Sequence, residues 1–428
     1  MRKNRQKVAV IAGATGMAGR TLVEHLSQKK EWVIIPLARN IDDLQSTPGQ
    51  TFPVKADLMD RSGLRQALSG YQVTHLFHTA WFLPQTGIRQ EDGPILNPVR
   101  VKRQIAFAAN WIVPQFHRSQ RLQNLFYRAF IRQSGLLDSE QRNLMMLTNI
   151  VEVLAEPPHQ LEHVALLTGG RFYGLHIGPS LYPGYRLPLS EHMPCHPAPS
   201  AYAEMEGYLQ ERALNTFSWS VVRPTFIVGR SPKPRQNIGY AVAIYAWLLK
   251  EMGEPLIFPG GLDSYQVKGQ FSDSRLLASM LEWSADDPVA ANNVFNLVNG
   301  DVVSWEEIWP KLGDYFGMQI AIPADGADLN VLLARRHEVW ARLRQKHQLP
   351  TLPLEAVFSA QFLAAAMVIN WDIVFSMDKA RRFGFRESIR TEQMFTDLFE
   401  SLAADKIIPP RPFVISSGLN FDANQPVI

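Results

Sequence analysis

Residues 8–26 read VAVIAGATGMAGRTLVEHL, an apolar segment followed by glycines at the spacing Gly13-x-x-Gly16-x-x-Gly19. The apolar residues predict a β-strand, and the apolar residues after the last glycine recur at the spacing of an amphipathic helix. Glycines at these positions let the backbone turn tightly and come close to a pyrophosphate, which the N–H groups at the start of the helix can bind. The segment therefore predicts a dinucleotide-binding turn.

Strand and helix patterns alternate from this turn to residue 225. Strands are expected over residues 8–12, 32–38, 51–58, 73–81, 163–168 and 218–225. The alternation predicts an α/β fold with a Rossmann-type doubly wound parallel sheet. We expect an NAD(P)-binding domain over residues 1–235. Residues 236–428 are expected to form a smaller, mostly helical C-terminal substrate lobe, some segments of which return to the first domain.

The end of the second expected strand bears on the choice of cofactor. NAD sites place a carboxylate about 20 residues after the glycine turn, whereas this chain has Arg39 and Asn40 there. A guanidinium suits the 2′-phosphate of NADPH, with a solvated Arg39 as the alternative, and the nearby Asp42 leaves NADH open. Asp57 ends the third strand, where it either touches the adenine ring or caps the next helix.

Ligands of a doubly wound sheet bind beyond the carboxyl ends of its strands. Residues 79–81, 168–173 and 224–229 should therefore border one cleft. Cofactor contacts are expected from Gly13, Thr15, Gly16, Met17, Gly19, Arg39, Asn40, Asp57, Leu58, Thr79, Ala80, Thr168, Pro224, Phe226 and Ile227. Trp81 and Tyr173 are expected to line the substrate pocket.

Composition is that of an enzyme with a large core. The chain has 428 residues, 46% hydrophobic and 19% charged, and a net charge of +3 that points to no particular partner. Its one cysteine excludes a disulfide framework and a multi-cysteine metal site, and no metal is expected. A cytoplasmic location is expected, because the basic amino-terminal tail enters the first strand at once and the longest apolar run, 240–249, falls short of the roughly 18 residues of a membrane span.

Tyr202 begins the segment Tyr-Ala-Glu-Met-Glu206. Short-chain reductases place a lysine four residues after a catalytic tyrosine, on the same helix face, where it lowers the pKa of the tyrosine. Glu206 occupies this position and would disfavour a tyrosinate. Gly169 stands where a hydroxyl residue often assists carbonyl reduction. The positions that usually support ketone reduction or alcohol oxidation therefore lack the expected catalytic residues.

These departures from the usual reductase pattern are similar to those of one family. The chain is similar to the progesterone 5β-reductase and iridoid synthase group of extended short-chain reductases over nearly its whole length. The shared motifs are the glycine turn, LTGGRFY at 167–173, Tyr202 with Glu206, VRPTFIVG at 222–229, FPG at 258–260, FSD at 271–273 and MDKARRFGF at 377–385. The resemblance implies an NADPH-dependent reductase of the carbon–carbon double bond of enones in specialised metabolism.

The resemblance also implies roles for individual residues. Tyr202 falls on the family's catalytic tyrosine, whose hydroxyl would stabilise the enolate formed when hydride adds to the β-carbon. Arg171 stands at the family's lysine position and keeps the positive charge. Ala203 replaces an aromatic residue, which would widen the pocket for a bulkier or differently shaped substrate than the family's usual enones. The partner implied is a small hydrophobic molecule. Reduction of C=O or C=N, and an NADP(H)-binding recognition or assembly protein without turnover, are the alternatives.

Residues 83–140 are expected to form a basic, aromatic, helical insertion. Residues 83–135 contain eight arginines or lysines against two acids, and 121–131 have the spacing of an amphipathic helix. A packed subdomain with a basic face, a lid over the substrate, a homodimer surface and a helix that lies on a membrane surface are the alternatives. No nucleic-acid motif is present, and no nucleic-acid partner is expected.

Overall fold

A computed structural model describes residues 6–44, 49–82, 136–176, 178–180, 182, 184–196, 200–232, 234 and 236–412. Most of the expected insertion, residues 83–135, lies outside the described residues. The lid, homodimer and membrane-surface alternatives for this segment therefore lie outside them too. Among the described residues, no helix is both long and apolar enough to cross a membrane.

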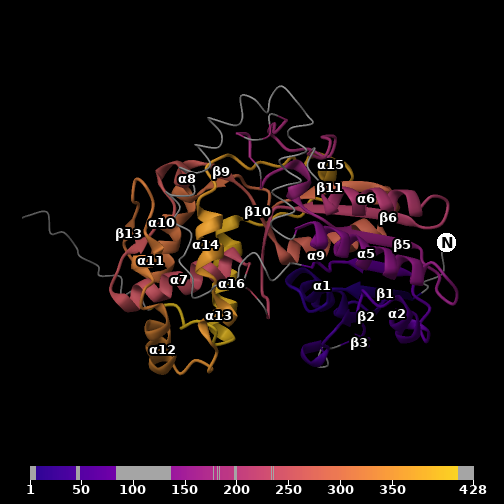
Figure 1. Cartoon of the computed structure of the whole chain (residues 1–428), viewed down its shortest axis with the longest axis horizontal. Helices are drawn as coiled ribbons and strands as arrows, with labels where there is room; N and C mark the ends of the chain where they lie inside the picture. The colour runs from indigo at the N-terminus through magenta and orange to yellow at the C-terminus, as the bar shows by residue number, and fades with distance from the viewer. Residues whose placement is uncertain are drawn as a thin grey trace, which may run out of the picture.

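The central sheet has seven parallel strands in the order β11-β6-β5-β4-β1-β2-β3 (Figure 1). Their bounds are β1 Lys7–Ala12, β2 Trp32–Ala38, β3 Val54–Lys55, β4 His75–His78, β5 His163–Leu167, β6 Ser218–Pro224 and β11 Asn293–Leu297. This confirms the predicted α/β doubly wound fold. The order reverses at β1 and β4, and the crevice outside such a reversal is where these sheets bind ligands.

Two strands are shorter than the sequence pattern predicts. The segment 51–58 forms regular pairs only over β3, after Phe52 N–H donates to Ile34 O at 2.8 Å. Pro53 follows and has no N–H for the ladder. The segment 73–81 leaves the sheet after Thr79, whose N–H still donates to Ala12 O at 2.9 Å.

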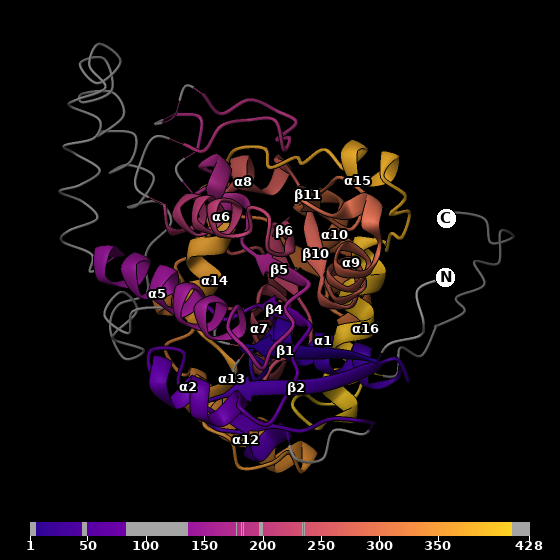
Figure 2. The same cartoon turned by 90° about the vertical axis from the view of Figure 1, so that its right-hand side faces the viewer.

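Helices cover both faces of the sheet (Figure 2), with bounds α1 Met17–Ser27, α2 Arg61–Leu68, α5 Leu136–Leu154, α6 Ala201–Arg212 and α9 Ser274–Asp286. Side chains of a strand alternate between the two faces. Ile11 and Phe77 therefore pack with α1 and α9, while Val10 and Leu76 pack with α2, α5 and α6. Because both faces are buried, the strands read as continuous apolar runs.

The carboxyl-terminal region is mostly helical, as predicted, and lies beside the sheet domain (Figure 1). Its larger helices are α7 Ile238–Met252, α10 Trp305–Phe316, α12 Arg336–His347, α14 Ala360–Met367 and α16 Thr391–Ala404. Helix α7 is buried on all sides from Ile238 to Leu249, as expected of a helix that is apolar all round. Trp309 and Trp340 belong to the same core. By contrast, α9 and β11 come from this half of the sequence but complete the sheet domain.

Shorter elements connect the larger ones. The strands are β7 Phe226–Val228, β8 Leu256–Ile257, β9 Lys268–Gly269, β10 Phe271–Asp273, β12 Val303–Ser304 and β13 Ile320–Ala321. The helices are α8 Leu262–Gln266, α11 Leu329–Leu332, α13 Leu354–Val357, α15 Asp378–Arg382 and the 3₁₀ helices η1 Asp42–Leu44, η2 Gly170–Tyr173 and η3 Pro288–Ala290. β7 and β10 pair in parallel where the sheet domain meets the carboxyl-terminal lobe.

The glycine turn joins β1, α1 and the end of β4 through close backbone contacts. Gly13 has a φ of +86°, and a Cβ added there would lie 2.6 Å from the Ala80 nitrogen. A Cβ at Gly19 would lie 2.3 Å from Gly13 O and 2.7 Å from Thr79 Oγ1. Both positions therefore require glycine, one for its conformation and contacts and the other for its contacts alone.

We expect Gly19→Ala to lower the free energy of unfolding by about 1–3 kcal/mol, because the new methyl group overpacks a site closed by backbone atoms. Urea unfolding followed by circular dichroism measures the change. Gly70→Ala is the matched control, since a Cβ added there has no atom within 4 Å. Equal stability of the two variants would contradict the tight turn.

Candidate active site

The start of α1 has the shape and the donors to bind a pyrophosphate. Gly16 is the N-cap, and the first turn after it contains no acidic residue, so its backbone N–H groups face no competing carboxylate. Gly16 N–H itself donates to Gly13 O at 2.9 Å, which closes the turn before the helix. At Met17 the sulfur accepts a hydrogen bond from Asn237 Nδ2 at 3.2 Å. Thr15 lies in the turn and is partly exposed.

Arg39 and Asn40 lie exposed directly after β2. Asn40 Oδ1 accepts a hydrogen bond from Asp42 N–H at 2.9 Å, which shapes the start of η1. In the part of the chain that the structure describes, the Arg39 guanidinium forms no ion pair. Arg39 is thus available to a ligand at the end of β2, next to the glycine turn.

Asp57 follows β3 and is exposed, while Leu58 is buried. Asp57 Oδ1 accepts from Met59 N–H at 2.9 Å, within its own turn. The N-cap of α2 is instead Asp60, whose carboxylate accepts from Gly63 N–H at 3.0 Å. The alternative that Asp57 caps this helix is therefore wrong.

The predicted catalytic residues meet in one pocket at the carboxyl edge of the sheet. Its lining residues are Trp81, Ser139, Glu140, Arg171, His176, His196, Ser200, Ala201 and Tyr202. The rings of Trp81 and Tyr202 pack with their centroids 4.7 Å apart. Burial raises the pKa of Tyr202 and the neighbouring Arg171 opposes this, so the hydroxyl stays protonated at neutral pH and can donate.

Gly169 places the end of β5 beside the Tyr202 hydroxyl. A Cβ added to Gly169 would lie 3.6 Å from that hydroxyl and 3.4 Å from Pro224 O. The tyrosine therefore reaches the point where β5 and β6 end. This is the edge of the sheet at which ligands of doubly wound folds bind.

Glu206, at the position of the usual lysine, is held by Arg223. Arg223 Nε donates to Glu206 Oε1 at 3.0 Å and Nη2 donates to Oε2 at 2.5 Å, and both side chains are 4% exposed. Thr168 Oγ1 donates to the same carboxylate at 2.8 Å. The Thr168 hydroxyl, expected near the cofactor, is thus engaged within the protein.

Tyr173 belongs to the same buried network rather than to the pocket described above. It is 1% exposed, accepts a hydrogen bond from Arg223 Nη1 at 2.8 Å and donates to Asn296 Oδ1 at 2.7 Å. The Arg223 guanidinium also lies 3.3 Å from the centroid of the Phe172 ring. The network connects η2, β6, β11 and α6. Tyr173 therefore helps to hold Arg223 and Asn296 in position.

Ala203 is partly buried and, like Tyr202, packs against the core that includes Tyr173, but it is not among the residues that line the Tyr202 pocket. Sequence reasoning missed Glu140 and His196, which line that pocket. The spacing of Glu140 and Asn143 could have indicated Glu140, because residues three apart lie on the same face of a helix. His196 offered no comparable signal.

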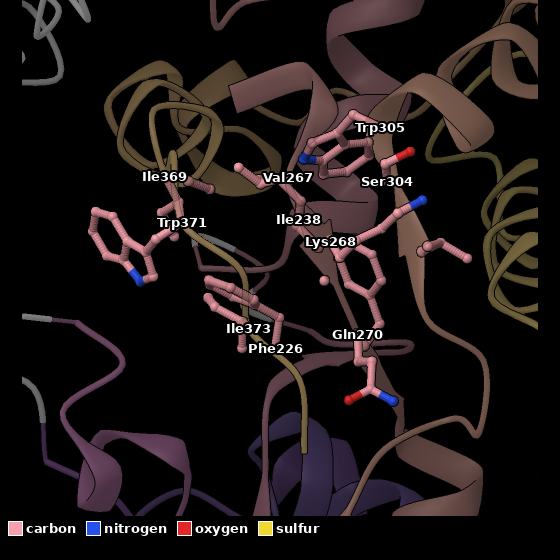
Figure 3. Close-up of a pocket in the computed structure, with 14 residues that line it drawn as sticks. Phe226, Ile238, Val267, Lys268, Gln270, Ser304, Trp305, Ile369, Trp371 and Ile373 are labelled. Carbon is pink, nitrogen blue, oxygen red and sulfur yellow. The ribbon is translucent and has the colours of Figure 1, made fainter. Parts of the chain in front are cut away.

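A second, apolar pocket lies between the end of the sheet domain and the helical lobe (Figure 3). Figure 3 shows side chains from both parts converging on it, with Phe226 from β7 on one side. The apolar lining residues are Phe226, Ile238, Val267, Phe271, Val303, Trp305, Ala366, Ile369, Trp371 and Ile373. Trp371 Nε1 donates to Leu175 O at 3.2 Å, which links this lobe to the segment after η2. Ile227, next to Phe226, packs against the sheet core.

Comparison with known proteins places the chain in a family. The model of the PRISE-like Rossmann-fold domain matches residues 116–409. The chain belongs to this PRISE-like Rossmann-fold family. The model of the NAD dependent epimerase/dehydratase family matches residues 9–93 of the same chain. The PRISE-like protein is an NAD(P)-dependent oxidoreductase, as predicted.

Individual relatives agree with this assignment. The PRISE-like chain is 26% identical to a 3-oxo-Delta(4,5)-steroid 5-beta-reductase of Arabidopsis thaliana, over 94% of each chain. It is 25% identical to an (S)-8-oxocitronellyl enol synthase of Catharanthus roseus, over 95% of this chain and 94% of the relative. The structure of Bordetella bronchiseptica WbmG in complex with NAD shares the fold, with a TM-score of 0.57 and 13% identity over 95% of this chain and 97% of WbmG. The predicted resemblance to 5β-reductases and iridoid synthases is confirmed.

Glu206→Lys restores the usual tyrosine–lysine spacing, and we expect it to destabilise the protein by about 3–5 kcal/mol. The reason is that the new ammonium group and the Arg223 guanidinium would then be two buried cations without a counter-charge. Urea unfolding measures the loss. Glu211→Lys, exposed on the same helix, is the matched control and should unfold like the wild type. A stable Glu206→Lys protein that gains ketone reductase activity would contradict the structural role of the ion pair.

Proposed function

We propose that this protein reduces the activated C=C bond of an enone or enal, with NADPH as reductant and a small hydrophobic molecule as substrate. The observation that carries the proposal is the pairing of Glu206 with Arg223 beside a protonated Tyr202. The position four residues after Tyr202 holds Glu206, and the described residues that line the pocket include no lysine to act as a proton relay. This favours a role for the Tyr202 hydroxyl as a hydrogen-bond donor to a developing oxyanion.

The cofactor fits the residues of the sheet edge. The close packing at Gly13 and Gly19 closes the turn against the end of β4, the exposed Gly16 caps α1 where backbone N–H groups can bind a pyrophosphate, and the exposed Arg39 suits a 2′-phosphate. NADPH, when bound, supplies the hydride. The predicted cofactor contacts of Asn40, Asp57 and the other residues named for the cofactor remain part of this proposal, except that the Thr168 hydroxyl is engaged by Glu206.

Two residues act on the substrate oxygen in this proposal. The Tyr202 hydroxyl donates a hydrogen bond to the carbonyl oxygen, where negative charge develops as hydride adds to the β-carbon. Arg171 lines the same pocket and places its positive charge near that oxygen. Such preorganised charge and hydrogen bonding stabilise the enolate without moving a proton to it.

The apolar pocket supports a hydrophobic substrate. It is walled by Trp305 and Trp371 from the lobe and by Phe226 from the sheet domain (Figure 3). Phe226 is also an expected neighbour of the cofactor, so this pocket adjoins the proposed cofactor site. The reductase and enol synthase names of the relatives point to the same class of chemistry.

The direct test is NADPH consumption against a panel of enones, enals, ketones and imines, with products identified by mass spectrometry and NMR. We expect reduction of C=C in enones or enals and no reduction of isolated ketones. Turnover confined to ketones or imines would overturn the proposal. Binding of NADPH without turnover of any compound would favour a recognition or assembly role.

For the cofactor, Arg39→Ala should weaken NADPH binding by about 1.5–3 kcal/mol and leave NADH binding nearly unchanged, because it removes a charge-assisted contact to the 2′-phosphate. Isothermal titration calorimetry with both cofactors measures the difference. Lys30→Ala, exposed before the start of β2, is the control. Equal affinity of the wild type for the two cofactors would refute this role of Arg39.

For the chemistry, Tyr202→Phe removes only the hydroxyl and should lower kcat by about 10²–10³-fold, the usual effect of losing an oxyanion donor. Cofactor affinity should stay the same. Tyr208→Phe is the control on the same helix, because that hydroxyl binds Glu152 at 2.9 Å. Full activity of Tyr202→Phe on a substrate of the wild type would remove Tyr202 from the mechanism.

A further inference from the structure

Glu140 lies in the same pocket as Tyr202 and Arg171, and hydride addition does not use it. Helix α5 presents it one turn before Asn143. The Asn143 amide accepts from Phe82 N–H at 2.7 Å and donates to Phe82 O at 3.0 Å. These bonds fix the start of α5 against the chain that leaves β4. Glu140 is therefore held at the pocket.

Reduction of an enone requires a proton as well as a hydride. Hydride addition at the β-carbon leaves the electron pair of the double bond in an enolate, and a proton must then reach the α-carbon. We propose that Glu140 is the acid that delivers this proton, an inference that rests on the proposed enone reduction. Its O–H bond breaks, a C–H bond forms at the α-carbon and the carbonyl is restored. The carboxylate regains a proton from water.

The surroundings of Glu140 favour its protonated form. Burial raises the pKa of Glu140 to about 7; Arg171 and the Ala201 N–H oppose this, and Glu204 adds to it. A carboxyl group with such a pKa both gives and regains a proton readily near neutral pH. The acid form is lost as the pH rises through this value, so activity should fall in the same direction.

The other titratable groups that line the described part of this pocket are poor acids near neutral pH. Burial and then Arg171 lower the pKa of His196 to about 4, and the same two causes lower the pKa of His176. Both imidazoles are therefore neutral. Burial raises the pKa of Tyr202, whose hydroxyl holds its proton. Glu140 is thus the group suited to give up a proton.

A purely structural role for Glu140 would be to bind the N–H of Ala201, the first residue of α6. Ser200, the N-cap of this helix, makes no side-chain capping hydrogen bond within the described structure. Glu140→Gln separates the two roles. The amide oxygen can still accept a hydrogen bond from Ala201, but the amide is not an acid.

The test uses 2-methylcyclohex-2-en-1-one and NADPH in D₂O, with the wild type and Glu140→Gln. For the wild type we expect deuterium at the α-carbon with one enantiomer in excess, and a kcat that falls as the pH rises through about 7. Glu140→Gln should lower kcat by about 10²–10⁴-fold. It should also lose the enantiomeric excess and flatten the pH profile. Glu211→Gln, exposed on α6, should behave as the wild type.

The outcomes separate this inference from the proposed function. A Glu140→Gln protein with unchanged kcat, pH profile and enantiomeric excess would overturn the role of Glu140 and leave enone reduction standing. If the wild type reduces neither this probe nor any other enone, both are overturned. Infrared titration of the protein without substrate gives a readout independent of turnover. A protonated-carboxyl band that titrates near neutral pH and disappears in Glu140→Gln supports the inference, and its absence from the wild type overturns it.

Discussion

The buried ion pair between Glu206 and Arg223 constrains the carboxyl edge of the sheet on the side of β5, β6 and β11. Each side chain is 4% exposed, and a buried charge is costly unless it is paired and its remaining hydrogen-bonding groups are satisfied. Thr168, directly after β5, and Tyr173, in η2, meet that requirement. The pair therefore fixes α6 against β6 and, through Tyr173 and Asn296, links it to β11. It does so one turn after the proposed catalytic tyrosine.

The same constraint limits the chemistry that Tyr202 can perform. The Glu206 carboxylate is paired with Arg223 and therefore cannot act as a base for Tyr202. Burial and the negative charge of Glu206 both raise the pKa of the Tyr202 hydroxyl. A protonated hydroxyl beside the positive Arg171 is suited to stabilise an oxyanion. Tyr202 with Glu206 in place of the usual lysine is thus consistent with a different mechanism. In it, one residue stabilises the oxyanion and another delivers the proton.

The two pockets differ in character. The pocket of Tyr202 is lined largely by charged and polar groups at the sheet edge, whereas the pocket of Trp305 and Trp371 is mostly apolar and lies between the sheet domain and the helical lobe. In the proposed function, the type of reaction depends on the residues of the sheet edge, and the apolar pocket bears on the choice of substrate.

The sequence by itself determined the features that depend on neighbours along the chain. The strand, glycine turn and helix of residues 8–26 were predictable because glycine spacing and hydrophobic period act locally, and β2 was found at its predicted residues. Tertiary structure decided the rest. The seventh strand β11, the pairing of Glu206 with Arg223, the burial of Tyr173 and the place of Glu140 join residues that lie on different elements. Their partners are selected by packing of the whole sheet and its helices, which no local pattern encodes.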